Sequence, residues 1–206
     1  MPKQKIVRSK SLLPIPEHNP FLYALLNSPA YGAHLPNAGR FLDLGCGYGS
    51  DAVYMAQHGY VVDAVEFDDA LVQRLLKVLA ERHVSNCTVY PMSILDFRWV
   101  RGDRYHAVQL WDILSELPAK DIESITSLAW HAVRPGGFIL VHVLSAERDE
   151  QRKVGKNTFY VRDLEHYFPK SINRSILTLT GEERHLLGKK VPMHEYITFI
   201  AQKPLR

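Results

Sequence analysis

The feature that most constrains the fold is a short apolar run that ends in three closely spaced glycines, FLDLGCGYGSD. Residues 40–44 have the length and composition of a buried parallel strand, and Gly45, Gly47 and Gly49 follow directly. Glycine accepts left-handed backbone and carries no side chain, so such a bend lets a ligand lie against the backbone and the start of the next helix. The run therefore predicts a strand, a ligand-binding bend and a helix.

The rest of the chain alternates between strand-like and helix-like spacing of its apolar residues. We expect Ser50 or Asp51 to cap the first helix, and Asp68 with Asp69 to open the second. The last two strand-like segments, residues 172–179 and 195–201, have no helix pattern between them. They are therefore predicted to pair as an antiparallel hairpin at one edge of the sheet. The alternation predicts an α/β fold with a Rossmann-like, doubly wound sheet. Further strands are expected at 60–66, 88–92, 105–111, 138–144, 172–179 and 195–201, helices at 122–133 and 161–167, and a turn at 134–137.

Length and composition indicate one globular domain. The chain has 206 residues, of which 46% are hydrophobic and 23% charged. No run approaches the ~20 apolar residues that span a bilayer, which excludes a membrane-spanning protein. Cys46 and Cys87 are too few for a disulfide framework and favour a cytoplasmic location. Residues 1–18 are expected to be a solvated basic tail, and residues 19–206 to form the domain.

Two carboxylates stand where they can select the ligand of the glycine bend. Asp43 precedes the first glycine by two residues, where it would repel a pyrophosphate but attract the cationic amino-acid portion of S-adenosylmethionine (SAM). Glu66 ends the second strand about 20 residues after the glycines, where a carboxylate can accept both ribose hydroxyls, and Phe67 can flank the adenine. Structural alternatives stay open: Asp43 caps backbone amides, Glu66 is a solvated strand end, and Phe67 packs in the core.

These residues, together with the turn sequence RPGGFILV, resemble the class I SAM-dependent methyltransferases over residues 19–201. Within that class the chain is similar to small-molecule and tellurite-resistance-type bacterial enzymes, including the segment HNPFLYALLNSPAYGAHLP before the first strand. The resemblance implies a seven-stranded, mostly parallel sheet with an antiparallel last strand. Cys46 lies among the cofactor-contacting residues of the loop and is expected to be a small packing residue. The implied cofactor contacts come from Asp43, Gly45, Gly47, Glu66 and Phe67.

The same resemblance extends to the loops after the third and fourth strands. The family places an acidic residue after the third strand to bind the adenine amino group, but the aligned residue here is Ser93. Ser93 is expected to accept the same bond, and the backbone of Ile94 to serve the adenine ring. In LWDILSELP, after the fourth strand, Trp111 and Asp112 are the candidates for contacts to the cofactor methionine and to the acceptor. Asp112 is equally a candidate helix N-cap.

Methyl transfer from a sulfonium is an in-line displacement, so alignment and exclusion of water contribute most and a general base is optional. The candidates for proton transfer are Asp112 and Glu116, of which Glu116 is favoured as structural. His142, at the end of the fifth strand, is a further candidate, and the alternative is a surface or hydrogen-bonded core histidine. The ten histidines include no H-x-x-x-H pair, so no metal site is expected. Segments 20–35, 111–117 and 146–160 are expected to roof the acceptor pocket.

The sequence therefore predicts a SAM-dependent methyltransferase with a small-molecule acceptor, because nearly all residues are used in the cofactor-binding core. The chain lacks an Asn/Asp-Pro-Pro-aromatic motif at the fourth strand, which disfavours DNA bases as acceptors. One alternative is an RNA or protein acceptor contacted by Lys3–Lys10 and Arg152–Lys153. The other is a protein that binds SAM or S-adenosylhomocysteine (SAH) without turnover, which the departure at Ser93 motivates.

Overall fold

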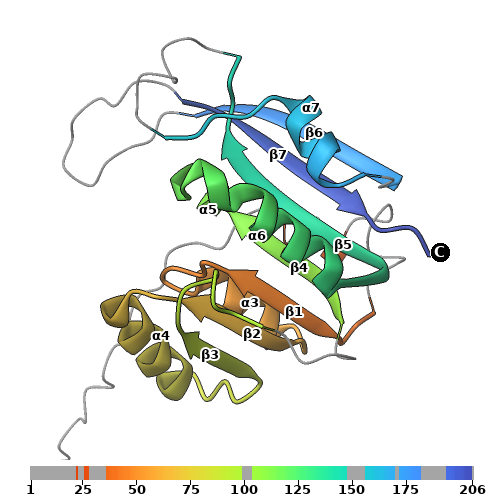
Figure 1. Cartoon of the computed structure of the whole chain (residues 1–206). Coiled ribbons are helices and arrows are strands. Elements are labelled where there is room, and N and C mark those ends of the chain that lie inside the picture. The colour runs from red at the N-terminus through yellow and green to blue at the C-terminus, as the bar shows by residue number, and fades with distance from the viewer. Residues whose placement is uncertain are drawn as a thin grey trace, which may run out of the picture.

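A seven-stranded sheet forms the centre of the molecule (Figure 1). The computed structural model describes residues 22, 26–27, 36–98, 104–147, 156–169, 172–181 and 194–205. The strand order is β3-β2-β1-β4-β5-β7-β6, which confirms the predicted doubly wound α/β fold with seven strands. The strands are β1 (Arg40–Leu44), β2 (Val61–Glu66), β3 (Cys87–Pro91), β4 (Tyr105–Trp111), β5 (Val133–Leu144), β6 (Ile172–Gly181) and β7 (His194–Gln202).

Strand β7 is the antiparallel strand of the sheet. It pairs antiparallel with β5 on one side and with β6 on the other, whereas β1, β2, β3, β4 and β5 pair in parallel. The predicted antiparallel pairing of the last two strands is therefore confirmed. This pair lies at one edge of the sheet, as expected, with β6 outermost and β7 between β5 and β6.

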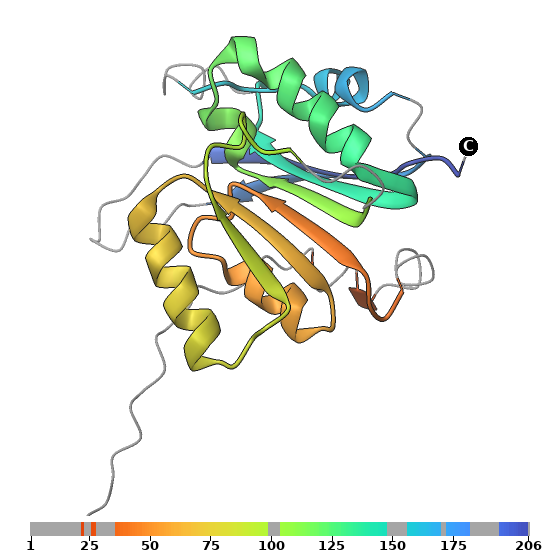
Figure 2. The ribbon, with the colours of Figure 1, turned by 60° about the horizontal axis from the view of Figure 1, so that its bottom comes forward.

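Five helices of the described chain cover both faces of the sheet (Figure 2). Helices α3 and α4 pack on one face, and α5, α6 and α7 on the other. The predicted turn at 134–137 lies inside β5, where the register against β4 shifts between Tyr105 and Ala107 and Gly136 adopts a φ of 77°. The bounds are α3 (Ser50–Gln57), α4 (Asp69–Glu81), α5 (Ile113–Glu116), α6 (Ala119–Ala132) and α7 (Val161–Tyr167).

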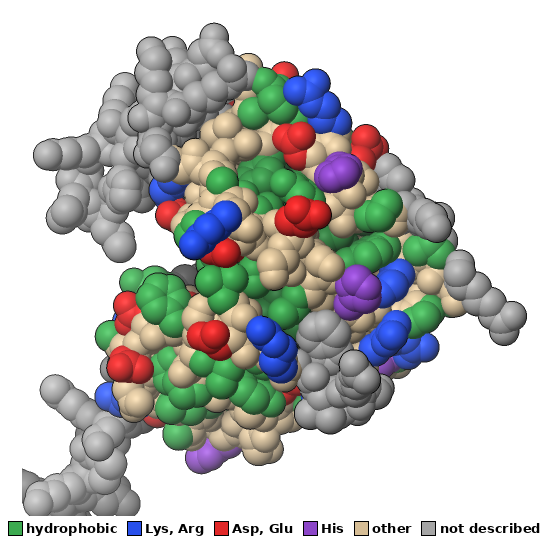
Figure 3. Space-filling view, in the orientation of Figure 1, with side chains coloured by type: hydrophobic (Ala, Val, Ile, Leu, Met, Phe, Trp, Pro, Cys, Tyr) green, Lys and Arg blue, Asp and Glu red, His purple; other side chains and the backbone are tan. Residues whose placement is uncertain are grey.

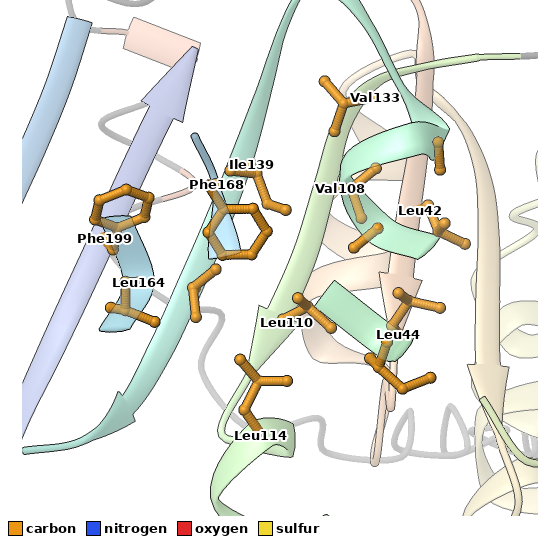
Figure 4. Close-up of a cluster of buried hydrophobic side chains, with 14 of the residues drawn as sticks. Leu42, Leu44, Val108, Leu110, Leu114, Val133, Ile139, Leu164, Phe168 and Phe199 are labelled. Carbon is orange, nitrogen blue, oxygen red and sulfur yellow. The ribbon is translucent and has the colours of Figure 1, made fainter. Parts of the chain in front are cut away.

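Two hydrophobic cores lie on opposite faces of the sheet. Side chains alternate along each strand, so Phe41 joins the core under α3 and α4 while Leu42 joins the core under α5, α6 and α7. Figure 4 shows the second core, in which Leu110 of β4 and Leu114 of α5 lie close to the end of β1. Both cores run under the carboxyl ends of the central strands, which fixes the loops that leave those ends.

The predicted basic tail at residues 1–18 lies outside the described residues, and so does most of the segment 20–35. Leu22, one of its described positions, is fully buried against the core under α3 and α4. Within the described ranges, none of the helices combines the length and the apolar character that a membrane span requires.

A buried carboxylate with a complete set of partners lies within the sheet. Asp63 on β2 is 3% exposed, and its Oδ2 accepts hydrogen bonds from Arg40 Nη2 at 2.7 Å and Tyr105 Oη at 2.6 Å. Tyr90 Oη donates to Oδ1 at 3.3 Å. Burial, followed by the bond to Asp63, raises the pKa of Tyr105 above its ordinary value. The cation and the two phenols together satisfy the charge, so this cluster is structural.

Replacing Tyr105 with phenylalanine should lower the free energy of unfolding by roughly 1.5–3 kcal/mol, because a hydrogen bond to a buried carboxylate is lost while ring packing is kept. Tyr90→Phe is the matched control and should cost less than about 1 kcal/mol, since its bond is longer and its ring is partly exposed. Guanidinium unfolding measures both changes. Equal losses would contradict the role given to Tyr105.

Candidate functional site

The predicted glycine bend connects β1 to α3 through three residues in the left-handed region. The φ angles are 75° at Gly45, 53° at Gly47 and 74° at Gly49, which side-chain-bearing residues adopt at a cost. The backbone N–H groups of Gly45 and Cys46 both donate to the carbonyl oxygen of Val65, at 2.9 and 3.0 Å. These bonds tie the bend to the end of β2, so its backbone forms a fixed surface.

The expected capping of α3 by Ser50 or Asp51 is wrong. Gly49 occupies the N-cap position in left-handed conformation, and no side chain caps the helix. A Cβ at Gly49 would lie 2.3 Å from Leu75 Cδ1, so α4 packs directly against this backbone. Asp51, in the first turn of α3, instead accepts a hydrogen bond from Gln109 of β4.

Two buried aspartates share the amide of one glutamine. Gln109 Nε2 donates to Asp43 Oδ1 at 3.2 Å and to Asp51 Oδ2 at 2.7 Å, one proton for each carboxylate. Asp43 is 2% exposed and Asp51 8%. Burial raises the pKa of Asp43 well above its ordinary value of 3.8, the charge of Asp51 raises it further, and the bond from Gln109 partly opposes both. The alternative that Asp43 caps backbone amides finds no support in these contacts.

A cavity of about 280 Å³ opens between the bend and the end of β4. It brings together six residues that the sequence placed at the cofactor and acceptor, Asp43, Gly45, Cys46, Gly47, Trp111 and Asp112. Sequence reasoning missed the other four lining residues, which are Tyr48, Ser50, Asp51 and Gln109. The signal for Gln109 was present, because it is a polar residue inside an otherwise apolar buried strand. The lining residues are Asp43, Gly45, Cys46, Gly47, Tyr48, Ser50, Asp51, Gln109, Trp111 and Asp112.

Glu66 is not among those lining residues, but it holds the adjoining backbone in place. Its Oε2 accepts the N–H of Gly47 at 2.9 Å, and its Oε1 accepts those of Phe67 and Asp68, each at 2.9 Å. The residue is 6% exposed, so the alternative of a solvated strand end is wrong. A carboxylate offers about four acceptor positions, and three of these are occupied by backbone donors that link the bend to the start of α4.

The residues predicted to surround the adenine do not line the cavity. Phe67 is 72% exposed, so the alternative that it packs in the core is wrong. Ser93 Oγ accepts the N–H of Leu95 at 3.2 Å, and Ile94 is 6% exposed. Cys46 packs against the core under α3 and α4, and burial raises the pKa of its thiol.

Asp112 combines an unusual backbone with an accessible carboxylate. It occupies the N-cap position of α5 with a φ of 59°, and its side chain makes no capping bond. Its N–H donates to the carbonyl oxygen of His142 at 3.0 Å, and its side chain is 52% exposed. Asp112 therefore occupies the N-cap position, as the alternative expected, but its side chain does not cap the helix.

His142 lies at the end of β5 in a stack of three rings. Trp111 is parallel to it at 4.1 Å between ring centroids, and Tyr196 follows on β7 at 4.7 Å. Its Nδ1 is 2.9 Å from Thr198 Oγ1, and its Nε2 is 3.6 Å from Asp112 Oδ1. Burial lowers the pKa of His142 to about 4, so the ring is neutral at neutral pH.

Two of the segments expected to roof the acceptor pocket meet at α5. The N–H of Asn157 donates to the carbonyl oxygen of Ser115 at 3.1 Å, and its side-chain amide donates to that of Leu117. Lys156 forms an ion pair with Glu116, which supports a structural role for Glu116. No group of three or more His, Cys, Asp or Glu side chains that could hold a metal ion occurs within the described residues.

Comparisons with known proteins find that the chain is similar to methyltransferases. A family model described as a methyltransferase domain matches residues 41–137. Glycine N-methyltransferase of Mus musculus is 28% identical over 184 residues, which cover 81% of this chain and 58% of that protein. The chain thus spans less than two thirds of the length of this relative.

Solved structures share the fold at low sequence identity. Phosphoethanolamine N-methyltransferase 2 of Haemonchus contortus, in complex with phosphomonomethylethanolamine and SAH, has a TM-score of 0.69 at 16% identity, covering 89% of this chain and 52% of its own. TehB from Haemophilus influenzae has a TM-score of 0.66 at 16% identity, with coverages of 89% and 60%. A putative methyltransferase from Bacillus halodurans has a TM-score of 0.69 at 14% identity, with coverages of 90% and 100%.

Asp43→Asn should stabilise the protein at neutral pH. Because the pKa of Asp43 is raised in the folded state, stability is lost as pH rises from its ordinary value through the folded one. The asparagine removes that loss, so the melting temperature should rise by roughly 2–4 °C for each kcal/mol relieved.

The advantage of Asp43→Asn should disappear below a pH of about 4, where the wild-type carboxyl is protonated in both states. Thermal unfolding across pH measures the difference, with Asp96→Asn on an exposed position as control. A wild type at least as stable as Asp43→Asn at neutral pH would show that the buried carboxylate carries no penalty.

Proposed function

We propose that the chain is a class I SAM-dependent methyltransferase that transfers a methyl group from SAM to a small-molecule acceptor by in-line displacement. The observation that carries the proposal is the cavity in which side-chain-free backbone meets two buried carboxylates, Asp43 and Asp51. It lies at the carboxyl ends of β1 and β4, where doubly wound sheets bind ligands. A surface with these carboxylates attracts a cationic ligand.

The residues present fit SAM. Asp43 and Asp51 would hold its ammonium group, since both carboxylates are buried and Asp43 accepts its hydrogen bond from the neutral amide of Gln109. Glu66, which has one acceptor position left beside its three backbone donors, would accept one ribose hydroxyl, and Phe67 would cover the adenine with its exposed ring. Ser93 and the backbone of Ile94 would meet the adenine edge, with Gly45, Cys46 and Gly47 under the nucleoside and Trp111 beside the methionine portion.

SAM supplies an electrophilic methyl group on a positively charged sulfur, so the protein needs mainly to align the acceptor and exclude water. Trp111 and Asp112 line the cavity at the end of β4 and would form the acceptor side. Asp112, with a carboxylate that is 52% exposed, can accept a proton from the acceptor and pass it to solvent.

A small acceptor is favoured over a macromolecular one by the names of the proteins that the chain resembles and by its surface charge. The glycine and phosphoethanolamine N-methyltransferases that resemble the chain are named for small acceptors. The basic residues that would support an RNA acceptor, Lys3–Lys10 and Arg152–Lys153, lie outside the described residues. Figure 3 shows acidic and basic side chains interspersed over the described part of one face, without a continuous basic surface.

Calorimetry with SAM and SAH, followed by transfer of labelled methyl groups into a metabolite extract, tests the proposal. We expect binding of both nucleosides and label in an extractable small molecule. Label in RNA or protein instead would assign a macromolecular acceptor, and binding without any transfer would assign a binding protein. No affinity for either nucleoside would overturn the whole assignment.

Gly47→Ala should weaken SAM binding roughly 10- to 100-fold, the effect of about 1–3 kcal/mol of steric overlap. Gly47 lines the cavity, and no protein atom lies within 4 Å of a Cβ added there, so the new methyl group would occupy ligand space. Gly59→Ala is the matched control, because Gly59 has a φ of 87° and lies outside the lining. Both variants should lose about 1–2 kcal/mol of stability, but Gly59→Ala should keep the SAM affinity.

A further inference from the structure

We infer that Asp112 selects an amine as the methyl acceptor and that His142 is a positioning residue that holds the Asp112 carboxylate toward that amine. The inference rests on the proposed function and adds to it the chemical class of the acceptor. Three observations carry it: the charge of the cavity lining, the backbone of Asp112, and the contacts on the two nitrogens of His142.

The charged side chains in the described part of the cavity lining are all acidic. Among the described residues that line it are three aspartates, Asp43, Asp51 and Asp112, and no lysine or arginine. SAM brings an ammonium, a sulfonium and a carboxylate, hence a single net positive charge. An acceptor that arrives as an ammonium supplies a further one, whereas an anionic group beside Asp112 would be repelled. The aromatic surface of Trp111 also favours a cation over an anion.

The backbone of Asp112 directs its carboxylate to the cavity rather than to a helix end. A left-handed conformation at a non-glycine residue is unfavourable by about 1–2 kcal/mol, so the surrounding structure must hold it. The bond from Asp112 N–H to the His142 carbonyl oxygen, at 3.0 Å, fixes that backbone against β5. The carboxylate makes no capping bond to α5 and lines the cavity with its side chain 52% exposed.

The contacts of His142 favour one of its two neutral tautomers. We assign the hydrogen of the ring to Nε2, because Nε2 faces Asp112 and an ionised carboxylate only accepts hydrogen bonds. Nδ1 then accepts from the hydroxyl of Thr198, at 2.9 Å. Trp111 and Tyr196 hold the ring from its two sides. The 3.6 Å separation from Asp112 Oδ1 exceeds a hydrogen bond, and such contacts tighten when substrate binds.

This arrangement makes His142 a donor to Asp112 and not the base of the reaction. An amine bound at Asp112 as an ammonium loses one proton, to the carboxylate and on to water, before its lone pair can attack. The new carbon–nitrogen bond forms as the carbon–sulfur bond breaks, and the electron pair of that bond stays on sulfur, which becomes the neutral thioether of SAH. The product is a methylammonium, so one proton is released for each methyl group transferred.

The acceptor class is tested on the full chain with matched pairs of amines and oxygen compounds: phenethylamine and phenethyl alcohol, ethanolamine and ethylene glycol, glycine and glycolate. The rate of SAH formation is measured for each. We expect kcat/KM for the preferred amine to exceed that of its oxygen partner by at least about 100-fold. A preference for an oxygen partner, or no transfer to any of these amines by protein that binds SAM, overturns the inference and leaves SAM binding intact. A lack of SAM affinity would instead overturn the proposed function.

Asp112→Asn tests the selecting charge. It should lower kcat/KM for the amine by roughly 100-fold and raise its KM, with an unchanged dissociation constant for SAM. Glu116→Gln is the matched control, because Glu116 belongs to the same short helix, is also 52% exposed and pairs with Lys156. Equal effects of the two variants on kcat/KM would contradict the role of Asp112.

Two variants of His142 separate positioning from proton transfer. In His142→Gln the amide N–H can replace Nε2–H toward Asp112 while its oxygen accepts from Thr198, so kcat should stay within about 10-fold of wild type. His142→Leu keeps the bulk but no donor and should lose about 100-fold, as for a misplaced catalytic group. Both should bind SAM as wild type does. A kcat of His142→Gln as low as that of His142→Leu would overturn the positioning role.

Discussion

The arrangement of the site depends on the amide of Gln109, which donates one hydrogen bond to Asp43 and another to Asp51. The register of β1 against β4 sets Gln109 beside Asp43, and the first turn of α3 brings Asp51 to the same nitrogen. Two ionised carboxylates this deeply buried would otherwise repel each other strongly, because the protein interior screens charge poorly. Asp43 precedes the glycine bend and Asp51 follows it, so the two hydrogen bonds from Gln109 fix both ends of the bend.

A comparison of two buried aspartates explains why we assign a structural role to one and propose the other as a binding group. Asp63 is paired with Arg40 and accepts two phenol hydrogens, so its charge is satisfied within the protein. Asp43 accepts a hydrogen bond from the neutral amide of Gln109. Burial and the nearby charge of Asp51 raise the pKa of Asp43. A buried carboxylate whose surroundings disfavour its charge is a binding group for a cation. Burial of apolar side chains in the two cores offsets the stability that is lost by burying the Asp43 carboxylate.

The antiparallel direction of β7 brings two of its residues to the end of β5 that is proposed to face the acceptor. Because β7 runs opposite to β5, its early residues Tyr196 and Thr198 lie beside the carboxyl end of β5, where His142 projects. A parallel last strand would place its final residues there instead. The ring stack that includes Trp111 therefore draws on β4, β5 and β7, and it supports Asp112 at the point where the chain leaves the sheet.

The sequence by itself determined the order of strands and helices and the glycine bend, because apolar spacing and glycine conformation are local properties. It also identified Asp43, Trp111 and Asp112 as residues of one site, since parallel strands bring their carboxyl ends to a common edge. Only the tertiary structure decided that Asp51 accepts a hydrogen bond from Gln109 instead of capping α3. The same is true of the exposure of Phe67 and of the contact between His142 and Thr198. Those outcomes depend on strand register and on the direction of β7, which pair residues far apart along the chain and leave no local pattern in it.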